Sequence, residues 1–130
     1  MENSMPLVSM IIPCYNVRHK IQRMLESLLR QTYRRIEVIF IDDGSTDGTG
    51  DFIASYRDKL IGAGIEVSYF YQENCGQAVA VNRGLKEMRG DYLVWPDADD
   101  WFSDDSVEKK LRFLESHPEY GVVTSNAVVS

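Results

Sequence analysis

The chain has 130 residues, a length typical of one domain, and its 44% apolar and 26% charged residues are those of an ordinary globular protein. Its net charge of −6 disfavours a nucleic-acid-binding protein, which normally presents a basic face. No apolar run approaches the ~20 residues that cross a bilayer, and the first residues lack the features of a signal peptide. We therefore expect no transmembrane segment and a cytoplasmic location, with any attachment to the cytoplasmic face of a membrane supplied by other parts of a longer protein.

Strand-like and helix-like segments alternate along the chain. In order, the apolar patterning predicts a strand over 7–12, a helix over 17–30, a strand over 36–41, a helix over 52–60, a strand over 65–71, a helix over 78–88, a strand over 92–95, a helix over 105–114 and a strand over 120–124. We expect Gly90 to end the third helix. Asp105 and Glu108 have the spacing of a capping box for the fourth.

Short connections between alternating strands and helices are typical of βαβ units. We therefore predict an α/β/α sandwich with a mostly parallel sheet of about five strands. In such sheets ligands bind at the carboxyl ends of the strands. Binding residues are thus expected directly after Ile12, Ile41, Tyr71 and Trp95.

Pro13, Cys14, Tyr15 and Asn16 follow the first predicted strand. Proline is expected to end the strand pairing, and Asn16 is suited to cap the next helix. These residues could therefore form an ordinary strand-to-helix turn as well as a binding segment.

Two adjacent carboxylates, Asp42 and Asp43, follow the second predicted strand. Gly44 permits a positive φ in the turn, and Ser45 and Asp47 can cap the next helix. Side by side, two buried carboxylates repel, and one is driven to its neutral form unless donors are supplied. The imide N–H of uracil or thymine is such a donor, so a nucleobase-binding role is favoured over a purely structural one.

Asp97 and Asp99 follow the fourth predicted strand and are separated by the small Ala98. In an extended segment two residues two apart project to the same side, whereas Asp100 projects away. Mg²⁺ and Mn²⁺ commonly take one or two protein carboxylates and complete their shell with phosphate oxygens and water. The triplet therefore predicts a partial site for Mg²⁺ or Mn²⁺.

The third predicted strand is followed by Gly76 and the start of a helix. A helix N-terminus can bind an anion, but the same residues fit a turn and a helix start, and the sequence does not decide between these interpretations. Cys14 and Cys75 lack metal-ligand spacing and are expected to be reduced thiols.

Four short motifs occur in an order that resembles the family 2 glycosyltransferases of the GT-A fold. They are P-x-Y-N after the first strand, D-D-G-S-x-D after the second, N-x-G twice around the third helix, and G-D-Y followed by D-x-D-D around the fourth strand. Each motif is weak alone, but the four in this order and spacing are specific, and the resemblance covers about residues 8–123.

The resemblance implies a donor site for a nucleotide-diphosphate sugar of the UDP or dTDP type. It implies that Pro13, Tyr15 and the two adjacent carboxylates line the nucleoside pocket, with Asp97 near the ribose or the metal and Asp99 as the principal metal ligand. The predicted substrate-binding residues are Pro13, Cys14, Tyr15, Asn16, Asp42, Asp43, Ser45, Gly76, Asp97, Ala98 and Asp99, and the predicted metal ligands are Asp97 and Asp99.

The same resemblance implies metal-assisted, inverting transfer of the sugar to a saccharide or lipid-linked acceptor, in polysaccharide biosynthesis. Family members have a catalytic domain about twice as long, with the base in the later half, and nothing after Trp101 resembles it. We therefore expect residues 1–130 to be the nucleotide-sugar-binding part, inactive alone. Val81 also stands where the family often has arginine, so the contact of that arginine is not carried over.

Three other classes remain as alternatives. A nicotinamide-dependent oxidoreductase would need a glycine fingerprint after the first strand, where Pro13 stands instead. A phosphoryl-transfer domain would also gather aspartates at strand ends, but with a nucleophilic Asp early in the chain and a partner lysine later. A non-catalytic sugar- or nucleotide-binding module is the third alternative, and the expected absence of the catalytic base makes it partly true of residues 1–130.

Overall fold

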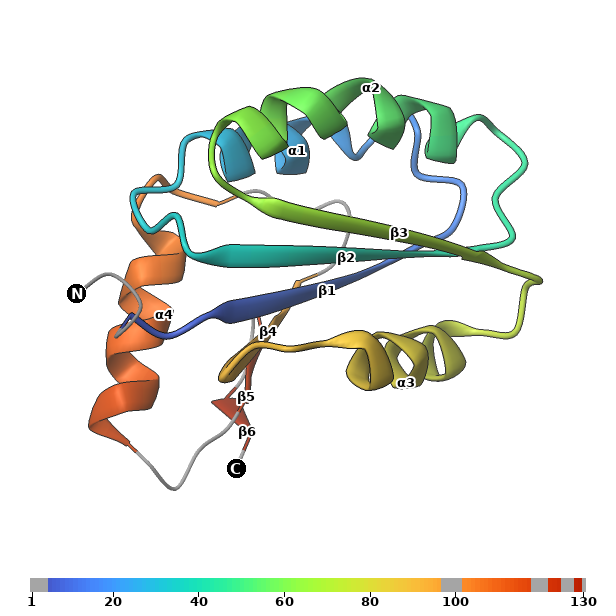
Figure 1. Cartoon of the computed structure of the whole chain (residues 1–130). Coiled ribbons are helices and arrows are strands. Elements are labelled where there is room, and N and C mark those ends of the chain that lie inside the picture. Colours follow the sequence, from blue (N-terminus) through green and yellow to red (C-terminus); the bar gives the residue numbers. More distant parts are fainter. Residues whose placement is uncertain (1–4, 97–101, 118–121, 125–127, 130) are drawn as a thin grey trace.

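The computed structural model describes residues 5–96, 102–117, 122–124 and 128–129, and Figure 1 shows the chain. Strands and helices alternate as predicted. In order they are β1 Val8–Cys14, α1 Gln22–Leu29, β2 Ile36–Asp43, α2 Thr49–Gly62, β3 Glu66–Gln72, α3 Gln77–Glu87, β4 Tyr92–Trp95, α4 Ser106–Ser116, β5 Val122–Thr124 and β6 Val128–Val129. None of the helices in these ranges is both long and apolar enough to cross a bilayer.

The strands form one sheet in the order β3-β2-β1-β4-β5-β6. All neighbours from β3 to β5 pair in parallel, which confirms the predicted mostly parallel sheet, and β6 pairs antiparallel with β5. No strand was predicted for β6, because a two-residue pairing is too short to produce an alternating pattern. After β3 the chain crosses to the other side of β1, and the carboxyl ends of strands beside such a crossing are where ligands bind.

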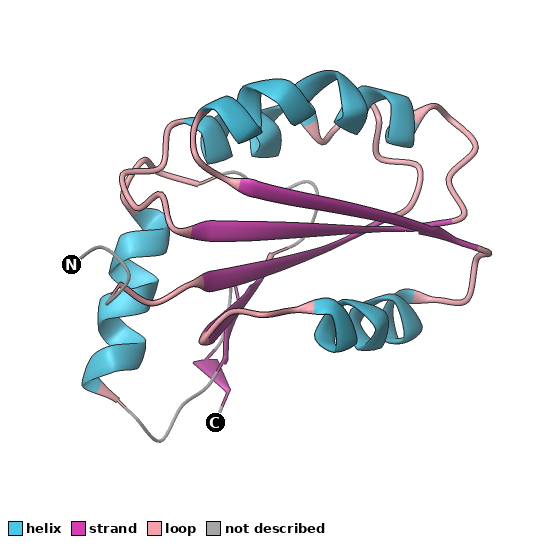
Figure 2. Cartoon of the chain, in the orientation of Figure 1, coloured by secondary structure: helices cyan, strands magenta, loops and turns pink. Residues whose placement is uncertain are grey.

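Helices cover both faces of the sheet, as predicted. Figure 2 shows α1 and α2 on one face and α3 on the other. Side chains alternate along β1, so Met10 and Ile12 join the larger core beneath α1 and α2, whereas Ile11 packs beneath α3 with Ile39 and Ala80. The two cores hold the strands rigidly and so fix where their carboxyl ends lie.

The predicted ends of the first two strands each fall two residues short. β1 continues through Pro13 to Cys14, in register with β2. β1 pairs with β4 only over residues 8–10, so a proline without an N–H is tolerated beyond them. β2 likewise includes Asp42 and Asp43, which therefore belong to the sheet and not to the following loop.

Three predicted helix signals act differently. The first helix begins at Gln22, because residues 17–21 form a turn. α3 ends at Glu87, and Gly90 instead permits close approach to β1, where an added Cβ would lie 2.7 Å from the carbonyl oxygen of Leu7. Asp105 precedes α4, but its side chain makes no capping hydrogen bond.

Candidate functional site

The carboxyl ends of β1, β2 and β3 lie together, at the right of Figure 1. The strand register places Cys14 beside Asp42 and Asp43 beside Gln72. The segments 13–16, 42–45 and 72–76 therefore meet at one edge of the sheet, as the sequence predicted. Asp97, Ala98 and Asp99, predicted to join them, lie outside the described residues.

Asp42 and Asp43 point to opposite faces of the sheet. Asp42 lies under α2, where its carboxylate meets Tyr69 and Gly50, whereas Asp43 lies at the start of α3. The expectation that the two carboxylates stand side by side is wrong, because successive residues of a strand alternate and both belong to β2. The two carboxylates therefore have separate roles.

Asp43 is held by donors from the β3–α3 connection. Its Oδ1 accepts hydrogen bonds from Gln72 Nε2 (3.0 Å) and from the N–H of Cys75 (2.8 Å), and its Oδ2 accepts one from the N–H of Gly76 (2.9 Å). Burial acts to raise the pKa of Asp43, but these three hydrogen bonds outweigh it and hold the pKa below its ordinary value. A carboxylate accepts about four hydrogen bonds, so one position remains on Oδ2.

These contacts bear on the question left open at the third helix. The N–H of Gly76, with φ at +98°, already donates to Asp43. The anion at this helix N-terminus is therefore the protein's own carboxylate. The structure favours the turn interpretation for Gly76, which leaves its N–H unavailable to a phosphate.

Asp42 is almost completely buried, with 1% of its surface exposed. Its Oδ1 accepts a hydrogen bond from the N–H of Ser45 (2.9 Å), and its Oδ2 accepts one from the hydroxyl of Tyr69 (2.5 Å). Burial, and then the bond to Asp42, raise the pKa of Tyr69, so the phenol is protonated at neutral pH and can donate. Asp42 therefore stabilises its own turn and its contact with β3.

Four hydrogen bonds join the β1–α1 loop to the β2–α2 loop and the first residue of α2. They run from the N–H of Asn16 to Ser45 Oγ (2.9 Å), from the N–H of Thr46 to Asn16 Oδ1 (2.8 Å), from the N–H of Val17 to Thr49 Oγ1 (3.1 Å) and from the N–H of Arg18 to Asp47 Oδ2 (3.2 Å). The backbone of Asn16 has φ at +50°, which asparagine tolerates better than most residues. The two loops thus form one unit.

This arrangement corrects the predicted helix caps. Asn16 bonds to the neighbouring loop and does not cap α1, whose N-cap position is Ile21. Ser45 likewise serves the contact between loops, whereas Asp47 does accept a hydrogen bond from the N–H of Thr49 at the start of α2 (3.0 Å). Gly44 has the expected positive φ.

The remaining predicted residues differ in exposure. Tyr15 is 53% exposed, whereas Cys14 is buried and its thiol contacts the carbonyl oxygen of Ile12 (3.4 Å). Burial, and then the charge of Asp42, raise the pKa of Cys14, so it is a neutral thiol. A ligand at this edge would meet the ring of Tyr15 and could meet Cys14 only through its backbone.

The sequence patterns do not identify Tyr69 and Gln72, which donate to Asp42 and Asp43, as residues of the site. Both lie on β3, whose alternating pattern predicts a strand but not which partner each side chain meets. Gln72 could have been found, because a polar residue at the end of the third strand is expected at the same edge as Asp43. Among the described residues, no three His, Cys, Asp or Glu side chains could together hold a metal ion.

Comparison with known proteins gives consistent matches. The sequence profile of glycosyl transferase family 2 matches residues 9–130. A putative teichuronic acid biosynthesis glycosyltransferase, TuaG of Bacillus subtilis, is 42% identical over 114 residues, which cover 88% of this chain and 44% of that protein. The chain spans between 14% and 45% of the length of the curated relatives to which it is similar.

Solved structures with a similar fold include two with a bound nucleotide sugar. S. aureus TarS 1-349 in complex with UDP-GlcNAc has a TM-score of 0.74 at 30% identity, over 86% of this chain and 32% of that one. The mannosyltransferase PcManGT from Pyrobaculum calidifontis, in complex with GDP-Man and Mn²⁺, has a TM-score of 0.76 at 28% identity, over 84% and 32%. These similarities confirm the predicted GT-A fold.

Proposed function

Because the chain belongs to glycosyl transferase family 2, we propose that residues 1–130 bind the nucleotide-diphosphate sugar of an enzyme that transfers a sugar to a saccharide or lipid-linked acceptor. One observation carries the proposal. Asp43 is an ionised carboxylate with one remaining acceptor position, held where the loops after β1, β2 and β3 meet. The bound UDP-GlcNAc of TarS and GDP-Man of PcManGT support the same class of donor.

Asp43, and not Asp42, is the carboxylate that would bind the base. The imide N–H of uracil or thymine would donate to the remaining position on Asp43 Oδ2. Asp42 is 1% exposed and turned towards α2, so a base at this edge would not reach it. The exposed ring of Tyr15 offers an apolar surface for the base and ribose.

Asp97 and Asp99 would hold Mg²⁺ or Mn²⁺. Their carboxylate oxygens suit these hard cations, and they follow β4, which pairs with β1 beside the crossing point of the sheet. The Mn²⁺ bound to PcManGT supports a divalent ion in this family. When bound, the ion would stabilise the departing nucleoside diphosphate as a Lewis acid.

The chain's own residues would thus bind and orient the donor, and the acceptor and the catalytic base would come from a further part of the enzyme. We propose inverting transfer, with the base outside residues 1–130, so that this chain alone binds the donor without turnover. The name of TuaG supports a setting in the synthesis of a cell-surface polymer.

Calorimetry on the 130-residue chain tests this function. UDP and dTDP are expected to bind with Mg²⁺ or Mn²⁺ present and much more weakly with EDTA. CDP is the matched ligand, because cytosine has an acceptor where uracil has its imide N–H, and it should bind at least about tenfold more weakly. Equal affinity for UDP and CDP would contradict the role of Asp43.

The metal site is tested separately with Asp99→Asn. This variant should weaken UDP binding in the metal condition only. The control is Asp104→Asn, at an exposed carboxylate five residues later in the sequence that pairs with Arg30 (3.3 Å). If Asp99→Asn binds UDP as the wild type does, the metal assignment is wrong. Binding of NAD in place of UDP by the wild-type chain would restore the oxidoreductase alternative.

A further inference from the structure

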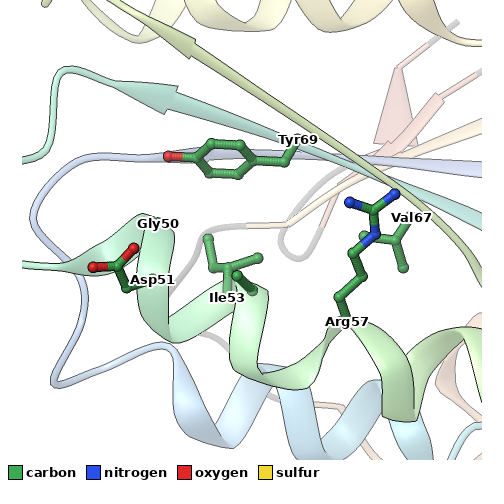
Figure 3. Close-up of a pocket in the computed structure, with 7 residues that line it drawn as sticks. Gly50, Asp51, Ile53, Arg57, Val67 and Tyr69 are labelled. Atoms are coloured by element: carbon green, nitrogen blue, oxygen red, sulfur yellow. The ribbon is translucent and has the colours of Figure 1, made fainter.

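A tyrosine outside the loops of the site, Tyr69, donates a hydrogen bond from its hydroxyl to Asp42. Tyr69 lies on β3, beside a pocket of about 270 Å³ between α2 and β3. Figure 3 shows its ring above α2, with the hydroxyl oxygen on the side of Gly50. The pocket is lined by Gly50, Asp51, Ile53, Ala54, Arg57, Val67 and Tyr69.

Three successive hydrogen bonds link Tyr69 to the β1–α1 loop. The Tyr69 hydroxyl donates to Asp42 Oδ2 (2.5 Å), Asp42 Oδ1 accepts from the N–H of Ser45 (2.9 Å), and Ser45 Oγ accepts from the N–H of Asn16 (2.9 Å). Asn16 follows Tyr15, an exposed aromatic residue at this edge of the sheet. Each link uses a different atom, so the bonds can form together.

We propose that Tyr69 is a positioning residue, whose hydroxyl orients Asp42 and thereby fixes the loop that carries Tyr15 for nucleotide binding. The inference rests on the proposed function. Loss of the hydroxyl would leave Asp42 Oδ2 without its donor in a residue that is 1% exposed. A buried acceptor without a partner is unfavourable, so the carboxylate would turn and release the N–H of Ser45.

The residue opposite Tyr69 supports this role. A Cβ added at Gly50 would clash with the Tyr69 hydroxyl and lie 3.5 Å from Asp42 Oδ2. Glycine is otherwise unfavourable inside a helix, and Gly50 is the second residue of α2. The contact therefore depends on two residues from different elements, one of which supplies the donor while the other leaves room for it.

Two variants and one control test the inference on the 130-residue chain. Tyr69→Phe and Gly50→Ala should each raise the Kd for UDP with Mg²⁺ about tenfold, as expected when one hydrogen bond to a charged group is lost. Alanine favours a helix over glycine, so weaker binding by Gly50→Ala would not reflect a weaker α2. The control is Tyr56→Phe, because Tyr56 on α2 also donates to a carboxylate, Glu26 (3.0 Å), but away from the loops.

A second measurement does not require a nucleotide. Amide hydrogen exchange, followed by NMR, should become faster at Ser45 and Asn16 in Tyr69→Phe and Gly50→Ala and stay unchanged in Tyr56→Phe. Unchanged exchange at these amides, together with unchanged affinity for UDP, would overturn the inference and leave the proposed function standing. A wild-type chain that binds neither UDP nor dTDP would overturn the proposed function, and the role of Tyr69 in binding with it.

Discussion

Two buried carboxylates lie on the same face of β2, Glu37 near its amino end and Asp43 at its carboxyl end. Glu37, 3% exposed, accepts hydrogen bonds from Ser9 Oγ and from the N–H of Arg89, both at 2.6 Å, and pairs with the guanidinium of Arg89 (3.1 Å). Asp43, 5% exposed, accepts three hydrogen bonds from uncharged donors. Within the described ranges no cation pairs with it.

The difference distinguishes a carboxylate that stabilises the fold from one suited to binding. The hydrogen bonds and the cation around Glu37 satisfy it and fasten the α3–β4 connection to the amino edge of the sheet. Asp43 is also held by three hydrogen bonds, but no cation pairs with its charge among the described residues and one acceptor position remains. A ligand N–H that fills this position meets a carboxylate that is already oriented, so little ordering is needed on binding.

Replacement of Glu37 should give the largest loss of stability. Glu37→Leu would leave Ser9 Oγ and the N–H of Arg89 without their acceptor in a buried site, which we expect to lower the free energy of unfolding by about 2–3 kcal/mol. Urea unfolding measures this loss. The affinity for UDP, measured where the variant is still folded, should stay within about twofold of the wild type. A large specific loss of affinity would remove the distinction between the two carboxylates.

Asp43→Asn should show the opposite pattern. The asparagine amide has one acceptor oxygen in place of two, so it cannot accept from the protein donors and from the base as Asp43 does. We therefore expect UDP binding to weaken by about tenfold to a hundredfold. Unfolding should be affected less than in Glu37→Leu, because the amide oxygen of asparagine can still accept from some of the donors around Asp43, whereas leucine accepts from none. Calorimetry and urea unfolding of the same samples check both expectations, with Asp58→Asn on the exposed side of α2 as the control. Equal affinity in the variant and the wild type would contradict base recognition by Asp43.

The convergence of the strand ends could be predicted from the sequence. Runs such as Ile36 to Ile41 fix the strands, and parallel strands bring their carboxyl ends to one edge. The opposite directions of the Asp42 and Asp43 side chains were not predicted, because both residues were placed after the second strand. Carboxylates are depleted in strands, so the pattern ended the second strand at Ile41, and the alternation that separates the two side chains was not extended to them.

Other contacts could not be predicted, because they depend on register and on close approach. The bond between Tyr69 and Asp42 requires the β2–β3 register, in which Asp42 pairs with Tyr71, and the length of the connecting helix does not specify it. Gly90 lies near a predicted helix end, which by itself indicates a helix cap. The need for glycine instead comes from its close approach to Leu7 and Ser9, which are far away in the sequence.

The lowered pKa of Asp43 makes its contribution to stability depend on pH. Its ordinary value is 3.8, and the folded-state pKa lies lower. Its contribution to stability is therefore fully present above the ordinary pKa of 3.8 and is lost as the pH falls through the folded-state pKa. The difference in unfolding free energy between wild type and Asp43→Asn should be constant near neutral pH and shrink below about pH 4. Urea unfolding across this range measures it, and a difference that grows in acid would contradict an ionised, hydrogen-bonded Asp43.

A partly exposed carboxylate should give the smallest effect, although it has as many partner residues as Glu37. Glu108 accepts hydrogen bonds from Thr32 Oγ1 (2.8 Å) and from Arg112 (2.7 Å), four residues later on α4. Water can replace both partners at the surface, so Glu108→Gln should leave the thermal midpoint unchanged within error. If this variant instead destabilised the chain as strongly as Glu37→Leu, the number of partners would govern the effect of a carboxylate on stability. Burial of the donors that lose their acceptor, which is the reason given for the large effect of Glu37→Leu, would then not be the cause.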